Sequence, residues 1–374
     1  MRIAVLGAGA MGSSAAVLLA RHDDVDLVVL DVDAARAEKV VAHIGRGEVH
    51  EVDITGGGLV ADLKSSGAEA VAACIPYRLN IPVMEACLEA GCHYADLGGL
   101  FHTTLRQLEL APRFAEAGIS AVLGIGSAPG ITNLLAKAGA ERLDEVRSID
   151  LLDGAVEPGG GFALPYSADT VIDEFTMPAM VWEDGEMKEL PAASGAIRYA
   201  FPDPIGEQEA FYTLHSEAAT LSTTIPGVQD VRWRLALPIK IAEGFRLLVG
   251  IGLASEDPET LSAGTVVPRE LLIKLLNRLP ESDEQPHDVE CIDARVAGVK
   301  DGAAHTVVER AMFHPTPDGL AAGNFGTAIP IATVSRWQAA GRVPGGVHPP
   351  ETAVPVREFL ADLAAEGVEF PPAE

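Results

Sequence analysis

The chain has few cysteines, and their placement excludes two classes of protein. Only four occur in 374 residues, and none forms a Cys-x-x-Cys pair or a zinc-finger spacing. A disulfide scaffold would need more cysteines in a shorter chain, and a zinc module would need paired ones. We therefore expect a protein of a reducing, cytoplasmic compartment that binds no metal.

Positive charge is also scarce. The chain has 27 basic against 54 acidic residues, a formal net charge of -27 at pH 7, and only seven of the basic residues are lysine. A surface this negative repels phosphate backbones and anionic lipid, so neither nucleic acid nor a membrane is an expected partner. Hydrophobic residues make up 48% of the chain and charged residues 22%, which is a globular composition, and the length suggests two domains.

A run of eighteen residues without a charge, 3–20, could be misread as a signal peptide or a membrane anchor. Its glycine spacing indicates a different structure. Residues 2–6 have the pattern of a short buried strand, residues 7–12 read Gly-Ala-Gly-Ala-Met-Gly, and residues 13–21 continue as an Ala/Leu-rich helix. This order of strand, glycine turn and helix is typical of a dinucleotide-binding Rossmann unit.

Each glycine of the turn has its own expected role. Gly7 permits the tight turn, Gly9 lets the backbone approach a pyrophosphate, and Gly12 lets the helix pack closely on the strand. The backbone N–H groups where the helix starts, at Ala10 and Met11, would face the phosphates together with the positive end of the helix dipole. We therefore expect these five residues to bind a nicotinamide dinucleotide.

A carboxylate at the end of the next strand favours NAD over NADP. Residues 26–30 form an apolar strand that ends at Asp31, nineteen residues after Gly12. Such a carboxylate accepts hydrogen bonds from the adenosine ribose hydroxyls and would repel the 2'-phosphate of NADP. The alternative is that Asp31 only caps the following helix, although Asp33 is the better placed cap.

Strands and helices then alternate to about residue 123. We expect helices over 34–44, 59–65, 81–90 and 104–117, and strands over 49–53, 70–75, 93–96 and 121–123. Such alternation builds an α/β domain with a doubly wound parallel sheet, whose ligands lie beyond the carboxyl ends of the strands. Residues at these ends are further candidates for cofactor contacts: Asp53, Cys74, Ile75, Pro76 and Gly98.

The simple alternation is lost after a strand over 146–152, and three consecutive glycines follow within 157–162. Candidate strands over 232–237, 288–299 and 305–313 suggest an antiparallel sheet with helices on one face. We expect a Rossmann domain over 1–130, an α+β substrate and dimerisation domain over 131–315, and a C-terminal segment over 316–374. This last segment, with helices over 331–339 and 356–366, is expected to pack back on the Rossmann domain.

Six segments spread over nearly the whole chain carry a family resemblance. They are GAGAMG (7–12), Asp31, EACLEAGCHYADLGG (85–99), GIGSAPGITNLLA (124–136), LDEVRSIDLLDG (143–154) and GVHPPETAVP (346–355). Together they resemble the saccharopine dehydrogenase-like family, and within it the lysine 6-dehydrogenase branch. The resemblance implies NAD(P)-linked oxidation of a C–N bond in an amino acid or polyamine. It also implies a homodimer or higher homo-oligomer formed through the second domain.

The lysine branch implies a specific reaction, in which a hydride leaves the carbon that bears the side-chain amine of L-lysine. The imine is then hydrolysed to a semialdehyde, with release of ammonia. Two segments depart from that branch. Where members of the branch tend to have Tyr-Pro-Gly-His, this chain has Leu237-Pro238-Ile239-Lys240. Where they have a Gly-Gly pair after His-Thr, this chain has TLHSEAAT at residues 213–220. Both lie in the expected substrate pocket, so the identity of the amine stays open.

Two other functions fit the same fold. A saccharopine or carboxynorspermidine dehydrogenase would act on a secondary amine that carries a second carboxylate-bearing arm, and its pocket would need more cationic groups. Convergence of Lys240, Arg198 and Arg234 on one cavity would favour it. A non-catalytic NAD-sensing protein would bind the cofactor without turnover, although the size of the second domain argues against this function.

Amine oxidation requires a neutral amine, and hence a base or a desolvating pocket. We expect Tyr94 and Asp96 at a strand end facing the cofactor crevice, where Asp96 would orient a cationic amine or accept its proton. The alternative is that Asp96 only caps the turn at Gly98. His215 is the second candidate base, because histidine has an unperturbed pKa of about 6.5.

The remaining candidates would bind the substrate. Glu217 could hold an ammonium group and Lys240 a carboxylate, although each could also be a solvated surface charge. Thr132 and Asn133 open a helix whose backbone N–H groups could bind a carboxylate, with helix capping as the alternative. His102 could line the mouth of the pocket.

Overall fold

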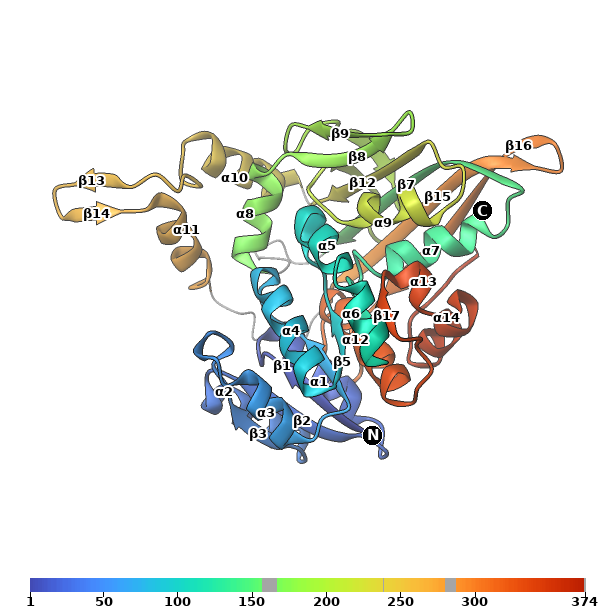
Figure 1. Cartoon of the computed structure of the whole chain (residues 1–374). Helices are drawn as coiled ribbons and strands as arrows, with labels where there is room; N and C mark the ends of the chain where they lie inside the picture. Colours follow the sequence, from blue (N-terminus) through green and yellow to red (C-terminus); the bar gives the residue numbers. More distant parts are fainter. Residues whose placement is uncertain (157–166, 238, 280–286, 373–374) are drawn as a thin grey trace.

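The computed structural model describes residues 1–156, 167–237, 239–279 and 287–372, and a seven-stranded parallel sheet forms its first unit (Figure 1). The strand order is β17-β6-β5-β4-β1-β2-β3. The strands are β1 (Arg2–Leu6), β2 (Asp26–Asp31), β3 (Glu48–Glu51), β4 (Ala70–Ala73), β5 (His93–Asp96), β6 (Ser120–Val122) and β17 (Gly346–His348). The doubly wound sheet expected from the sequence is confirmed. Its order reverses between β1 and β4, which is where such sheets bind ligands.

Helices cover both faces of this sheet, which explains why β1, β2 and β4 read as uninterrupted apolar runs. On one face lie α1 (Ala10–Ala20), α2 (Ala34–Ile44) and α12 (Ala322–Ala339). On the other lie α3 (Leu59–Ser66), α4 (Asn80–Ala90) and α6 (Ala111–Ala117). The C-terminal part of the chain therefore contributes both an edge strand, β17, and a covering helix, α12, to the first sheet.

The single helix expected over 104–117 is wrong, because the chain forms two helices there. They are α5 (Leu100–Leu108) and α6. Pro112 lies in the first turn of α6, where its missing N–H is tolerated. In the interior of a continuous helix the same proline would remove a backbone hydrogen bond and clash with the preceding turn.

The second unit is an eight-stranded sheet in the order β10-β11-β12-β7-β15-β16, with β8 paired to β12 and β9. Its strands are β7 (Glu145–Val156), β8 (Ala179–Glu183), β9 (Glu186–Leu190), β10 (Ile197–Ala200), β11 (Glu207–Phe211), β12 (Asp230–Ala236), β15 (Val289–Lys300) and β16 (Ala303–Phe313). The expectation of a purely antiparallel sheet is wrong at one place, since β12 runs parallel to β7. The long connection between them, whose described part contains two helices and four strands, returns the chain to the same end of the sheet.

One face of the second sheet is covered by α7 (Ile131–Ala140), α8 (Ala168–Thr176) and α9 (Glu217–Thr224). The apolar core under these helices is continuous with the core between α1, α12 and the first sheet. The short α13 (Pro350–Ala353) and α14 (Val356–Ala365) pack on α7. The two units are therefore joined by a shared core, and the ends of the first sheet's strands face the second unit.

A protruding arm is formed by α10 (Ile239–Gly250), β13 (Glu259–Leu261), β14 (Gly264–Val266) and α11 (Pro268–Leu276), and it extends to the left in Figure 1. Pro238 and the glycine-rich stretch at 157–162, both singled out in the sequence, lie outside the described residues. Among the helices that the structure describes, none is long and apolar enough to cross a membrane.

Candidate active site

The glycine turn after β1 forms an open cradle. Gly7 has a φ of +96°, and a side chain there would lie 2.4 Å from the carbonyl oxygen of Cys74. A side chain at Gly12 would lie 1.7 Å from the carbonyl oxygen of Gly7, so α1 packs directly on the turn. At Gly9, by contrast, a side chain would meet nothing within 4 Å. The turn therefore combines tight packing with the free approach that a pyrophosphate requires.

Asp31 ties this turn to the end of β2. Its Oδ2 accepts a hydrogen bond from the backbone N–H of Ala8 at 2.6 Å, and its Oδ1 accepts one from the N–H of Asp33 at 2.8 Å. The cap of α2 is Asp33, whose side chain accepts from the backbone of Arg36. Asp31 therefore places a negative charge beside the glycine turn, where the ribose of a dinucleotide lies in Rossmann folds.

Asp53 is exposed and caps a short 3-10 helix, η1 (Ile54–Gly56). Hydrogen bonds from the hydroxyl and the backbone N–H of Thr55 lower the pKa of this carboxyl group. Oδ1 of Asp53 thus accepts hydrogen bonds within its own turn, and these contacts indicate a structural role for Asp53 in that turn.

The end of β4 borders the cradle from the other side. Ile75 lies against Gly7, and Pro76 then leads into a second 3-10 helix, η2 (Tyr77–Leu79). Burial raises the pKa of the Cys74 thiol to about 12, so this thiol stays protonated near neutral pH. Cys74 can therefore pack against a bound group at this strand end, but it offers no thiolate there.

Asp96 lies at the end of β5 but does not face an opening. It is 1% exposed, and burial raises its pKa although its hydrogen bonds act against that rise. Five donors surround its two oxygens: the side chains of Tyr94, Asn80 and Gln107 and the backbone N–H groups of Gly98 and Gly124. Asp96 thus organises the turn at Gly98, the alternative role considered for it.

The expectation that Tyr94 faces the crevice needs correction. Its ring is fully buried in the apolar layer between the first sheet and helices α4 and α6. Its hydroxyl donates to Asp96 at 2.8 Å. Side chains alternate along a strand, and this register directs Tyr94 into the core beneath those helices.

The segment over 124–136 delivers three polar side chains to three buried carboxylates. Ser127 donates a hydrogen bond to Glu290, Thr132 donates one to Glu217, and Asn133 donates one to Glu351. Thr132 and Asn133 are almost completely buried. Their side chains therefore position carboxylates and do not line an opening.

The start of α7 does not offer free donors to a substrate. The backbone N–H of Gly130 donates to the side chain of Asn133, and that of Thr132 donates to the carbonyl of Ser127. The N–H of Ile131 donates to Gly126. Helix capping, the alternative considered for this segment, is therefore what the structure contains.

Four carboxylates gather where the two units meet, and we call them the acidic cluster. They are Asp153 on β7, Glu174 on α8, Glu217 on α9 and Glu290 on β15. The two strand residues lie on paired strands, on the sheet face that carries the shared core. Glu174, Glu217 and Glu290 are buried, and Asp153 is half-buried. Such a concentration of buried negative charge is costly unless cations or protons compensate it.

His215 supplies positive charge inside this cluster. Its Nε2 lies 3.0 Å from Glu174, its Nδ1 lies 3.3 Å from Glu217, and its ring stacks on Trp233 with 4.3 Å between centroids. Burial alone would lower the pKa of His215, but Glu217 and Glu174 outweigh burial and raise it to about 10. His215 is therefore an imidazolium near neutral pH, which disqualifies it as the general base expected from the sequence.

Asp153 is the carboxylate best suited to exchange a proton. Burial and repulsion by Glu174 and Glu217, opposed by His215, raise its pKa to about 7. Burial, followed by repulsion from Asp153, raises the pKa of Glu290 well above its usual range. Among the described residues, no hydrogen-bond donor contacts Asp153, and Oε2 of Glu217 also lacks a hydrogen bond. The cluster can therefore accept a further cation or donor.

A second opening, which we call the basic pocket, has a volume of about 450 Å³. Its lining combines basic and apolar side chains from η2, α4 and α5 with two residues of the second unit: Tyr77, Arg78, Ile81, Pro82, Gly99, Leu100, His102, Thr103, Arg106, Met177 and Leu214. His102 thus lies on the wall of a pocket, as expected from the sequence. Its neighbour Phe101 is buried and packs edge-on against it.

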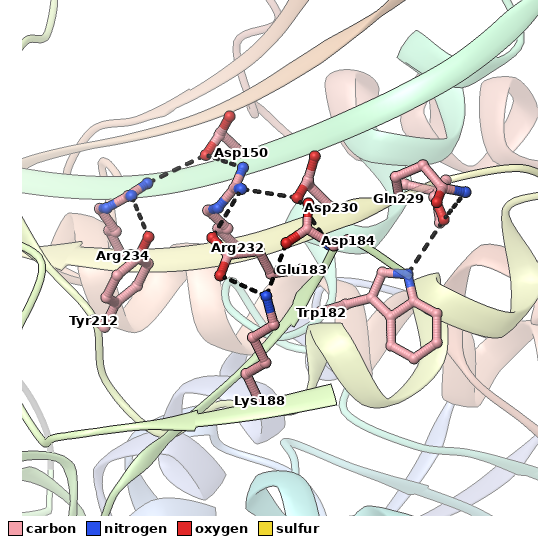
Figure 2. Close-up of polar contacts among 11 residues, drawn as sticks. Asp150, Trp182, Glu183, Asp184, Lys188, Tyr212, Gln229, Asp230, Arg232 and Arg234 are labelled. Atoms are coloured by element: carbon pink, nitrogen blue, oxygen red, sulfur yellow. Dashed lines mark hydrogen bonds and ion pairs between the residues drawn. The ribbon is translucent and has the colours of Figure 1, made fainter. Parts of the chain in front are cut away.

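The three cations whose convergence on one cavity would favour a saccharopine or carboxynorspermidine dehydrogenase do not converge. Arg198 is highly exposed on the edge strand β10 and pairs with Glu207, and Lys240 is exposed on α10. Figure 2 shows Arg234 on β12 held between Asp150 and Tyr212 within a network of ion pairs. These three side chains therefore contribute no shared carboxylate site.

Sequence reasoning missed Asp153, Glu174, Glu290 and Arg106. The three carboxylates are spread over more than a hundred residues of chain, and no spacing links them before the second sheet forms. Ser127 in the motif over 124–136 was a usable signal for Glu290, because a hydroxyl that becomes buried in a turn requires a hydrogen-bond partner. Nothing in the sequence marked Arg106 as a site residue, apart from its position four residues after His102.

Two family models cover nearly the whole chain. The "Saccharopine dehydrogenase NADP binding domain" matches residues 3–122, and the "Saccharopine dehydrogenase C-terminal domain" matches residues 126–368. Apo saccharopine dehydrogenase (L-Glu forming) from Saccharomyces cerevisiae has a similar fold, with a TM-score of 0.79 and 17% identity over 100% of this chain and 99% of that one.

Two curated relatives have similar sequences over most of their length. Carboxynorspermidine synthase from Vibrio alginolyticus is 28% identical over 335 residues, which is 82% of this chain and 80% of that protein. Carboxyaminopropylagmatine dehydrogenase from Synechocystis sp. is 27% identical over 318 residues, which is 82% of this chain and 79% of that protein. These names agree with the alternative function considered above better than with lysine 6-dehydrogenase.

Proposed function

The chain belongs to the saccharopine dehydrogenase family of NAD(P)-dependent oxidoreductases, and on that premise we propose that it acts on a carboxylated polyamine. The bond concerned is the C–N bond of a secondary amine. This proposal takes the place of the lysine 6-dehydrogenase function expected from the sequence. The observation that carries it is the acidic cluster, which gathers four carboxylates and His215 where the two units meet, with Glu290 bonded by Ser127 of the segment that follows β6.

The charge of the cluster fits a substrate with more than one cationic nitrogen. His215 compensates part of the charge of Glu174 and Glu217, whereas burial, together with repulsion from neighbouring carboxylates, raises the pKa values of Asp153 and Glu290. A bound polyamine would supply the missing positive charge. The net charge of -27 also attracts polycations to the surface before they bind. The names of the two curated relatives support the same substrate class.

Within this site the residues have separate tasks. Asp153 accepts the proton of the reacting amine, because a pKa of about 7 lets it change protonation state near neutral pH. His215 stays protonated and holds the side chains of Glu174 and Glu217 in place. Thr132 fixes Glu217 from the other side, through a hydrogen bond of 3.0 Å.

The glycine cradle fits a nicotinamide dinucleotide, which when bound would supply the hydride acceptor or donor for the C–N carbon. Gly9 leaves room for the pyrophosphate, and the first turn of α1 directs its N–H groups there. The carboxylate of Asp31 favours NAD, because it would repel the additional phosphate of NADP. A purely NAD-sensing function would leave the acidic cluster without a task.

The test is NADH or NADPH formation, followed by absorbance, with purified protein and a panel of amines. The panel holds carboxynorspermidine, saccharopine, L-lysine, ornithine and simple α-amino acids, and ammonia is measured in parallel. We expect turnover of carboxynorspermidine without ammonia, because its nitrogen stays in the amine product. Turnover of L-lysine with ammonia release would restore the lysine 6-dehydrogenase function, and cofactor binding without any turnover would support the sensing function.

A further inference from the structure

The basic pocket lies beside the acidic cluster but has the opposite charge. Arg78, His102 and Arg106 contribute to its wall, which also includes Leu100 and Met177. In a chain with twice as many acidic as basic residues, a pocket whose described lining has three basic side chains and no carboxylate is unusual. Charge of this sign, in a recess of about 450 Å³, points to an anionic group of a small ligand.

Two of the three basic side chains are free to bind a ligand. Arg78 donates to Asp173 at 3.0 Å, so its charge is compensated. Arg106 and His102 have no polar partner among the described residues, and both are exposed. They lie four residues apart on α5, so their side chains project from the same face of the helix.

The basic pocket and the acidic cluster are connected through adjacent residues on two segments. Leu214 lines the pocket, and the next residue, His215, lies in the cluster. On α8, Asp173 contacts Tyr77 and Arg78 at the pocket, and the next residue, Glu174, contacts His215. The two sites therefore lie next to each other, at neighbouring residues of the same two segments.

We propose that Arg106, with His102, binds the carboxylate of the substrate while the acidic cluster binds its cationic arm. The inference rests on the proposed function and names the part of the site that recognises the carboxylate. Leu100, Met177 and Leu214 contact the methylene groups between the two ends. An arginine suits this task because its guanidinium can donate two parallel hydrogen bonds to one carboxylate.

The proposal is tested with Arg106→Gln and two amines that differ only in the carboxylate, carboxynorspermidine and norspermidine. Loss of a charge-assisted contact should lower kcat/KM for carboxynorspermidine roughly 10- to 100-fold, mainly through KM, and leave norspermidine unchanged. Arg106→Lys keeps the charge and should recover part of the loss. Arg142→Gln is the matched control, since Arg142 is an exposed arginine paired with Glu309 on the second unit.

The outcomes separate this inference from the proposed function. If Arg106→Gln lowers kcat/KM equally for both amines, or if the wild type uses both equally well, the carboxylate site is overturned. If the wild type turns over neither amine, the proposed function fails instead. Calorimetric titration of the same two amines then decides the carboxylate site, which is supported if Arg106→Gln weakens only carboxynorspermidine and overturned if the wild type binds both alike.

Discussion

Among single residues, Asp96 and Asp153 are both aspartates, but their different surroundings give them different roles. Asp96 is buried with five hydrogen-bond donors around it, which fix its position and leave no oxygen for a ligand. Asp153 is half-buried among other carboxylates and has no donor in the described part of the chain. The first arrangement stabilises a turn, and the second produces a group that can take up and release a proton.

The sequence could not separate these two residues. Both follow an apolar strand, and the strand over 146–152 was expected to end before Asp153. In the structure β7 continues to Val156 and pairs there with β15, which places Asp153 near Glu290. Only the pairing of strands far apart in the sequence determines which carboxylate lacks donors.

Asp153→Asn should remove the acidic limb of the pH profile. In the wild type, kcat/KM for amine oxidation should rise with pH through about 7, because Asp153 must be deprotonated to act as a base. The variant should lose this limb, with kcat lowered roughly 10²- to 10⁴-fold. Steady-state rates from pH 5.5 to 9 provide the measurement.

The control is Asp150→Asn, on the opposite face of the same strand, where Asp150 pairs with Arg234 (Figure 2). This variant should keep the acidic limb at an unchanged pH. An acidic limb that persists unshifted in Asp153→Asn would assign the proton transfer to another group.

Among helices and strands, local sequence patterns were sufficient to predict most of the first sheet. The glycine turn, the apolar strands and the helix start at Ala10 depend on neighbours within a few residues, so their sequence signals are strong. The parallel pairing of β12 with β7 depends on a long connection and had no local signal. The acidic cluster belongs to this second kind, since each of its members comes from a different element.

The contact between β2 and the glycine turn is testable through cofactor preference. Asp31→Ala should weaken NAD binding about tenfold, because it removes a ribose acceptor and the hydrogen bond to Ala8. It should also relax the discrimination against NADP, because the repelling charge is gone. Fluorescence titration with NADH and NADPH measures both effects.

Asp33→Ala is the companion variant. It removes the cap of α2 and should cost about 1 kcal/mol of stability while leaving cofactor preference unchanged. An unchanged ratio of NADH to NADPH affinity in Asp31→Ala would defeat the assignment of Asp31 to cofactor selection.

At the scale of the whole molecule, the protruding arm carries most of the exposed large hydrophobic side chains. Of the ten such side chains in the described chain, seven lie on it: Ile239, Leu247, Ile251, Leu261, Leu271, Leu275 and Leu279. Residues 239–279 contain five basic and five acidic residues, so the arm is neutral in a chain of net charge -27. A neutral apolar surface permits self-association that the rest of the acidic surface would oppose.

We expect the chain to form a homodimer through this arm. Leu247→Glu combined with Ile251→Glu should convert the dimer to a monomer, since both side chains are 63% exposed and new charges there would be buried on association. Sedimentation equilibrium measures the mass. Leu105→Glu, at an exposed position on α5 of the first unit, should leave the dimer intact. A monomeric wild type at micromolar concentration would contradict the expectation.

A crystal structure of the protein with cofactor and carboxynorspermidine bound would show directly whether the acidic cluster holds the substrate. We expect the cationic nitrogens to lie within hydrogen-bond distance of the acidic cluster, with the reacting nitrogen next to Asp153. The carboxylate should lie against Arg106. A substrate bound outside the junction of the two units, or with its carboxylate directed at Glu217, would contradict the proposed function and the proposed carboxylate site.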